Sequence, residues 1–163
     1  MNIRPKFKLI FGLGNPDKQY ESTYHNAGHL AIDLLEKTAE LSTKISKSNT
    51  YMNESGKALK KLVKNTNIKP EEILVIQDDS DLFLGDFKLS FNRGSAGHKG
   101  IESIIRSLKT KVFWRLRIGI RPQPIKGRKR LRAEDFVLKK ISLKDKKTLR
   151  ETVKKACIFL TRS

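Results

Sequence analysis

Cysteine is nearly absent from this chain, which contains only Cys157. A lone cysteine excludes a disulfide bond within the chain and is typical of proteins from a reducing compartment. The chain has only three histidines, and none of them pairs with a cysteine at the spacing of a zinc site. We therefore expect a protein without a metal.

Long apolar segments are also missing. No run approaches the roughly 20 apolar residues of a membrane-spanning helix. The basic segment from Met1 to Lys8 is followed by an apolar run that is too short for a secretory signal and is interrupted by glycine. We expect one domain over residues 1–163, with no membrane partner, in the cytoplasm or in an organelle matrix.

Acidic residues are too few to balance the basic ones. The chain has 35 lysines and arginines against 17 aspartates and glutamates, which gives a formal net charge of +18. Such an excess strains the folded state through charge repulsion, and a polyanionic partner is its simplest explanation. The missing apolar segments make nucleic acid a better candidate than an anionic membrane. A lysine-rich genome composition is the alternative explanation.

What the chain does contain is a regular alternation of strand and helix patterns. Short apolar or alternating runs predict strands, and the segments between most of them carry apolar residues at helical spacing. We expect an α/β fold, a three-layer sandwich in which helices cover both faces of a mostly parallel twisted sheet. The predicted strands cover residues 8–13, 73–76, 87–91 and 113–120.

The stretch from Gly12 to Gly28 reads as the end of the first strand followed by a shaped loop. Such a loop presents polar side chains from a rigid base. Its glycines suggest a dinucleotide-binding turn, but Asp17 stands where the third glycine of that fingerprint belongs, and no helix follows directly. We therefore expect no cofactor.

His25 is the best candidate for a general base, because imidazole titrates near neutral pH. Asp78, Asp79 and Asp81 follow the predicted strand 73–76, at the strand end where α/β sheets bind ligands, and one of them could orient His25. With no Gly-x-Ser-x-Gly motif, an activated water is the better nucleophile. The alternative is that His25 is a structural polar residue and that the aspartates form a solvated turn.

Asn15 and Asn53 offer side-chain amides that can donate to a carbonyl oxygen as it gains charge. The alternative roles are a turn at Asn15, before Pro16, and a helix cap at Asn53.

Basic residues border the same ends of the strands, and such residues contact phosphate groups without reading a nucleic-acid sequence. The alternative is a charged face that only keeps the protein soluble. The residues concerned are Lys88, Lys99, Arg115, Arg117 and the loop 121–132, which we expect to be mobile.

Taken in register, blocks of this sequence resemble the bacterial-type peptidyl-tRNA hydrolases. No single block is specific, but together they span nearly the whole chain. In chain order they are Gly12-Leu-Gly-Asn-Pro16, Tyr20, His25-Asn-Ala-Gly28, Tyr51-Met-Asn-Glu-Ser-Gly56, Asp78-Asp-Ser-Asp81, Gly85, Gly94-Ser-Ala-Gly-His-Lys-Gly100 and Arg115-Leu-Arg-Ile-Gly-Ile120.

The resemblance implies a monomeric enzyme that hydrolyses the ester between a peptide and the terminal ribose of tRNA, without a metal. It implies that His25 activates water, that Asp78 orients His25, and that Asn15 and Asn53 hold the peptide main chain and its carbonyl.

The resemblance also implies two sets of binding residues. Lys88 and Arg117 would clamp the 5′ phosphate of the tRNA. The residues expected to contact the rest of the substrate are Tyr20, Asn26, Met52 and Lys99.

This chain departs from the family pattern at several places. Residues 42–49 replace a pair of strands, so we expect the sheet to lose one or two strands. Tyr24 and Gln77 replace an arginine and a histidine, and Lys99 replaces an asparagine, so we expect Lys99→Asn to improve turnover. These departures keep one alternative open, a non-catalytic RNA-binding relative that acts in a ribosome or RNA-processing assembly.

Overall fold

The computed structural model describes residues 5–38 and 43–161, and their strands form one five-stranded sheet with the order β2-β1-β3-β5-β4. Neighbouring strands are parallel except β4 and β5, which are antiparallel. The prediction of a mostly parallel sheet is confirmed. The strands are β1 Leu9–Gly12, β2 Lys44–Lys47, β3 Ile73–Phe83, β4 Phe87–Phe91 and β5 Trp114–Arg121.

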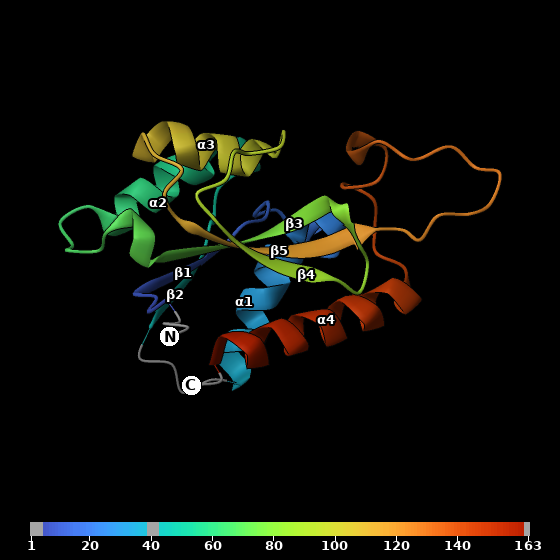
Figure 1. Ribbon diagram of the computed structural model, residues 1–163, viewed down its shortest axis with the longest axis horizontal. Coiled ribbons are helices and arrows are strands. Elements are labelled where there is room, and N and C mark those ends of the chain that lie inside the picture. The colour runs from blue at the N-terminus through green and yellow to red at the C-terminus, as the bar shows by residue number, and fades with distance from the viewer. Residues whose placement is uncertain (1–4, 39–42, 162–163) are drawn as a thin grey trace.

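Helices cover both faces of this sheet, as predicted (Figure 1). Helices α1 (Ala27–Thr38) and α4 (Leu143–Thr161) pack on one face, and α2 (Ser55–Val63) and α3 (Lys99–Leu108) pack on the other. No helix within the described residues is long and apolar enough to cross a membrane.

The hydrophobic core consists of two clusters, one on each face of the sheet, because the side chains of the buried strands alternate between the faces. Successive side chains of a strand point to opposite faces of the sheet. In β3, Leu74 and Ile76 accordingly pack in the cluster beneath α1 and α4, whereas Ile73 and Val75 pack in the cluster beneath α2 and α3. Burial on both faces explains why this segment is a continuous apolar run.

The structure narrows the expected loss of one or two strands at residues 42–49, because one strand is present there. Lys44–Lys47 forms the edge strand β2, which pairs in parallel with β1. The sequence hid this strand because an edge strand that is only partly covered needs few apolar residues. Ile45 alone packs against the core, while Lys44 is exposed.

The acidic residues of β3 also lie differently from the prediction. Asp78, Asp79 and Asp81 do not follow the strand but belong to it, because β3 continues to Phe83. The extension is held by β5, with Asp78 opposite Ile118 and Asp79 opposite Gly119. Asp78 therefore sits on rigid, paired backbone and not in a turn.

The β5–β4 side of the sheet carries basic side chains on the face that α2 and α3 leave open. Beyond β5, residues 122–132 form no helix or strand, and this loop projects away from the sheet (Figure 1). The chain then returns past the start of α1, where Ile141 N–H donates to the Ser22 carbonyl at 2.8 Å.

Close packing of α2 against α3 depends on Gly56. A Cβ atom at Gly56 would collide with the Ser103 carbonyl of α3, and the Gly56 N–H donates to Ser103 Oγ at 2.9 Å. Helix propensity alone predicts that Gly56→Ala stabilises the protein by about 1 kcal/mol. We expect the opposite, a loss of about 1–3 kcal/mol, because the helices must move apart.

Urea unfolding of Gly56→Ala measures this free energy. Lys60→Ala, at an exposed position of the same helix, is the control and should change the free energy of unfolding by no more than about 0.5 kcal/mol. A stabilised Gly56→Ala protein would contradict the close approach of the two helices.

Candidate active site

A cavity of about 580 Å³ opens beside the distal half of β3. Its wall is made by side chains from separate parts of the chain: the loop after β1, the turns before α1 and α2, strand β3 and the start of α3. Most of the predicted site residues line it, namely Asn15, Tyr20, His25, Met52, Asn53, Asp78 and Lys99.

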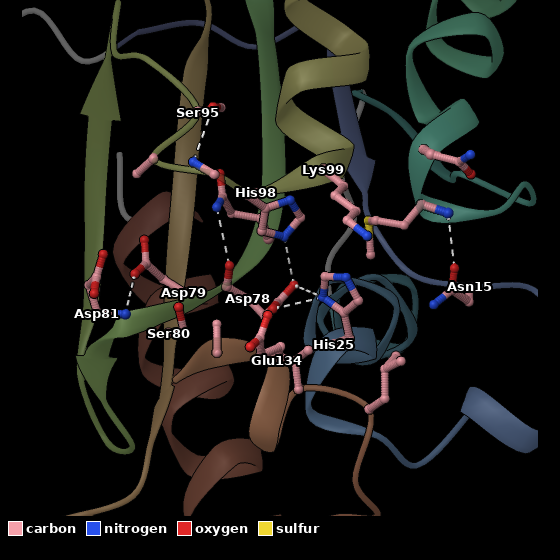
Figure 2. Close-up of a pocket in the computed structure, with 18 of the residues that line it drawn as sticks. Asn15, His25, Asp78, Asp79, Ser80, Asp81, Ser95, His98, Lys99 and Glu134 are labelled. Carbon is pink, nitrogen blue, oxygen red and sulfur yellow. Dashed lines mark hydrogen bonds and ion pairs between the residues drawn. The ribbon is translucent and has the colours of Figure 1, made fainter. Parts of the chain in front are cut away.

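His25 and Asp78 meet in this cavity. His25 Nδ1 lies 2.9 Å from Asp78 Oδ1 and 2.8 Å from Asp78 Oδ2. His98, from the loop before α3, approaches the same carboxylate, with Nε2 2.8 Å from Oδ1 (Figure 2). Sequence reasoning gave His98 no role. The available signal was its place in a glycine-rich loop directly before a helix.

The hydrogen bonds of His98 fix its protonation. Its Nδ1 caps α3 by accepting the backbone N–H groups of Gly100 at 3.2 Å and Ile101 at 3.4 Å. An accepting Nδ1 carries no proton, so Nε2 carries one and donates it to Asp78. In the same way His25 donates its Nδ1 proton to Asp78, which leaves His25 Nε2 as a free base.

His25, Asp78 and His98 also form a group in which the donor atoms lie within 4.8 Å of one another, close enough to be considered as metal ligands. The hydrogen bonds argue against that use. A metal at His98 Nε2 would move the proton to Nδ1, where it would face two backbone N–H donors. The arrangement suits a carboxylate held between two imidazoles.

Burial and neighbouring charges shift the pKa values of both His25 and Asp78. Burial alone would lower the pKa of His25, but the neighbouring Asp78 carboxylate outweighs burial and raises this pKa above its ordinary value of 6.5, while the Lys99 charge lowers it in part. Burial would raise the pKa of Asp78, which is 1% exposed, but attraction and hydrogen bonds from His25 and His98 bring it well below its usual range. Asp78 therefore stays ionised.

Asn15 is held so that one end of its amide faces the cavity. Its Oδ1 accepts the Met52 N–H at 2.9 Å, which leaves the side-chain NH₂ group as a donor toward His25 (Figure 2). Its backbone is braced by Asn26, whose Oδ1 accepts the Asn15 N–H and whose Nδ2 donates to the Asn15 carbonyl, both at 2.9 Å.

These bonds set Asn26 apart from the other residues expected to contact the substrate. Asn26 is 3% exposed, it does not line this cavity, and both polar atoms of its amide are occupied by Asn15. Its place in the structure is that of a support for Asn15.

The remaining wall combines polar and apolar groups. Asn53 is exposed in the short turn Met52–Glu54 and does not cap α2, so its amide is available to the cavity. Val137 and Leu138 line the opposite side, and the Val137 carbonyl accepts the His25 N–H at 2.8 Å. The sequence gave no signal for residues 133–138, which have no helix or strand periodicity.

Lys88 and Arg117 lie outside the cavity, in a neighbouring depression of about 420 Å³ on the open face of β4 and β5. They are directly opposite each other in the antiparallel pair. Arg117 Nε also contacts Asp79 Oδ2 at 2.6 Å, and Lys88 is exposed. The same depression contains Arg93 and the buried Arg115.

Two of the departures from the family pattern have structural roles in this chain. Tyr24 donates its hydroxyl hydrogen to Asp145 at 2.5 Å, which ties the turn that carries His25 to α4. Gln77 is buried behind Asp78, accepts from Arg115 Nη1 at 3.4 Å and donates to the Asp78 carbonyl at 3.1 Å. Both side chains support the backbone of the His25 and Asp78 pair.

Comparisons with known proteins point to one family. A family model described as peptidyl-tRNA hydrolase matches residues 9–162. The chain is 41% identical to a peptidyl-tRNA hydrolase of Hydrogenobaculum sp., with 96% of this chain and 90% of that protein covered. It is 38% identical to the peptidyl-tRNA hydrolase of Aquifex aeolicus, over 96% of this chain and 89% of that protein.

A solved structure gives the same result for the fold. The crystal structure of peptidyl-tRNA hydrolase from Acinetobacter baumannii superposes with a TM-score of 0.81 at 29% sequence identity, and covers 94% of this chain and 86% of that one.

Proposed function

Because the chain belongs to the peptidyl-tRNA hydrolase family, we propose that its cavity hydrolyses the ester bond of peptidyl-tRNA and releases a peptide and free tRNA. The observation that carries this proposal is the contact between His25 Nδ1 and the buried Asp78 carboxylate. It leaves His25 Nε2 as a base beside the amide donor of Asn15.

The proposed reaction uses water as the nucleophile. His25 Nε2 takes a proton from a water molecule while the water oxygen bonds to the ester carbonyl carbon. The carbonyl oxygen gains negative charge, which the amides of Asn15 and Asn53 stabilise. The bond to the ribose oxygen then breaks, and that oxygen takes the proton from His25. Asp78 keeps the imidazole oriented and stabilises its positive charge.

The neighbouring depression supports a second part of the proposal, the binding of the tRNA 5′ phosphate by Lys88 and Arg117. These two cations lie side by side on paired strands, next to the cavity that would hold the 3′-terminal ribose, which belongs to the same end of the acceptor stem as the 5′ phosphate. Phosphate contacts of this kind fix the position of a nucleic acid on a protein.

This phosphate site predicts the effect of Lys88→Ala and Arg117→Ala. We expect both variants to raise the apparent KM. Each should also lose about one phosphate contact, which reduces the slope of the logarithm of the tRNA binding constant against the logarithm of the salt concentration by about 0.7–0.9. The effect of Arg117→Ala should be larger, because it also leaves Asp79 unpaired beside the phosphate.

Filter binding of uncharged tRNA at increasing salt measures the slope, and steady-state hydrolysis measures KM. Lys111→Ala removes an exposed charge that lines neither hollow and serves as the control. Equal slopes for wild type and Arg117→Ala would exclude the proposed contact.

Release of free tRNA from a purified N-acetyl-aminoacyl-tRNA tests the main proposal. Wild-type protein should turn over many equivalents of this substrate. Tight binding of tRNA without release, even at enzyme concentrations near that of the substrate, would instead favour the non-catalytic RNA-binding alternative.

We further propose that the protein acts as a monomer in the compartment that contains its tRNA substrate. The proposed reaction uses His25, Asp78, Asn15 and Asn53, which already line the same cavity, so the proposed mechanism calls for no group from a second subunit. A mass measured by light scattering at working concentration tests this point.

A further inference from the structure

Acidic side chains line the cavity, and each of them has a positively charged or imidazole partner. The pairs are Asp78 with His25 and His98 at 2.8 Å each, Asp79 with Arg117 at 2.6 Å, Asp81 with Arg130 at 3.0 Å and Glu134 with Arg132 at 3.0 Å. The acids of the cavity are therefore neutralised from within the protein.

Lys99 is the exception among the ionic groups of the cavity. It is the only lysine or arginine in the lining, and within the described residues its ammonium makes no ion pair or hydrogen bond. Its side chain extends from the start of α3 toward His25 (Figure 2). An uncompensated positive charge thus faces the free side of the proposed base.

The position of Lys99 is unfavourable for the helix that carries it. Lys99 is the first residue of α3, directly after the cap residue His98. The N-terminus of a helix is its positive end, so a cation there is repelled. Glu102 in the first turn of α3 offsets part of this repulsion, but it accepts a hydrogen bond from Ser95, and no ion pair within the described residues joins it to Lys99. The contacts therefore give no support to a structural role for the charge of Lys99.

We infer that Lys99 is a catalytic residue whose ammonium contacts the oxyanion formed when water attacks the ester carbonyl. This inference rests on the proposed ester hydrolysis. As the water oxygen bonds to the carbonyl carbon, its proton passes to His25 Nε2 and an electron pair moves onto the carbonyl oxygen. Lys99 stabilises that oxygen by its positive charge and keeps its own proton throughout the reaction. The ribose oxygen leaves with the proton that His25 took from water.

The inference reverses the expectation drawn from the sequence alone, in which Lys99→Asn improves turnover. With N-acetyl-aminoacyl-tRNA as the substrate, we expect Lys99→Met and Lys99→Asn to lower kcat by about 10- to 100-fold, since the loss of one oxyanion donor typically costs about 10²- to 10³-fold and Asn15 remains. KM should change by less than about threefold, and Lys99→Arg should restore part of the rate because it keeps the charge.

Two further readouts separate this role from a structural one. The thermal midpoint of Lys99→Met should be unchanged or higher, because the variant removes a cation from a helix N-terminus. The acid limb of its kcat/KM profile should move to higher pH, because the charge of Lys99 lowers the pKa of His25. The titratable or charged groups that face His25 in this experiment are Asp78, His98, Lys99 and Glu134 (Figure 2).

Lys111→Met provides the matched control, because it removes an exposed lysine that lines neither the cavity nor the neighbouring depression. It should leave both kcat and KM near the wild-type values. An unchanged kcat in Lys99→Met, with or without a raised KM, would overturn the catalytic role of Lys99 while leaving the hydrolase function in place. A wild-type protein that releases no tRNA would overturn both.

Discussion

Replacement of His25 by alanine is expected to lower the turnover of peptidyl-tRNA by about 10²- to 10⁴-fold, the usual contribution of a general base. Among the described residues that line the cavity, only His25 combines a free ring nitrogen with a carboxylate bound to the other nitrogen. The other imidazole, His98, has Nδ1 on the helix cap and Nε2 on Asp78. It has no free nitrogen with which to replace His25.

The pH dependence of the wild-type protein tests the same assignment. A base must be neutral to accept a proton, and Asp78 raises the pKa of His25 above 6.5. The rate should therefore fall as pH is lowered through that raised pKa, and it should be constant at higher pH. If the residual rate of His25→Ala still fell over the same pH range as the wild-type rate, the titrating group would be a residue other than His25.

Two measurements keep the His25→Ala result specific. Binding of uncharged tRNA should equal that of the wild type, because the proposed phosphate site lies outside the cavity. His25→Gln keeps the size of the side chain and should be as inactive as His25→Ala. Release of tRNA by either variant at the wild-type rate would contradict the proposed mechanism.

Asp78→Asn should have an effect of similar size, a loss of about 10²- to 10⁴-fold in kcat, for a different reason. The Asp78 carboxylate accepts one N–H from His25 and one from His98. An asparagine can accept at only one of its two ends, and its NH₂ group would face an imidazole. If His25 turns its lone pair on Nδ1 toward this NH₂ group, its proton moves to Nε2 and the base is lost.

The pH profile of Asp78→Asn separates it from a damaged fold. Without the carboxylate, burial and the Lys99 charge both act to lower the pKa of His25, so the acid limb of the residual activity should move to lower pH. Asp33→Asn removes a half-exposed carboxylate that pairs with Lys47 away from the cavity, and its activity should stay within about threefold of the wild type. An unshifted limb in Asp78→Asn would show that Asp78 does not set the pKa of His25.

Much of the fold could be predicted from the sequence, because buried parallel strands and amphipathic helices leave periodic signals. Residues 73–76 are apolar at every position and form the beginning of β3. Strand β2 left no such signal, since one edge and part of each face are open. The continuation of β3 to Phe83 was also hidden, because Asp78 and Asp79 are polar residues buried in a strand.

The candidate site could be predicted only in part, because a local sequence pattern shows the type of a residue but not its partner in the fold. The proposed chemistry requires particular residue types, a base and a carboxylate. His25 and Asp78 could therefore be recognised in the sequence as polar residues close to predicted strand ends. Asn26 shows the limit of this approach: its amide looked suited to a substrate, but its partner is the Asn15 backbone, eleven residues earlier in the chain. Local patterns do not reveal which group a polar side chain meets.

The sequence by itself determined the layered α/β fold, the family, the excess of positive charge and the residue types of the candidate site. Those follow from periodicity, composition and motifs, which are local properties of the chain. Only the tertiary structure decided that His98 joins His25 on Asp78, that Asn26 braces Asn15, and that Lys99 faces the cavity with no counter-ion among the residues that the structure describes. Each of these depends on contacts between distant segments, where burial and competition for hydrogen-bond partners fix the role of a polar group.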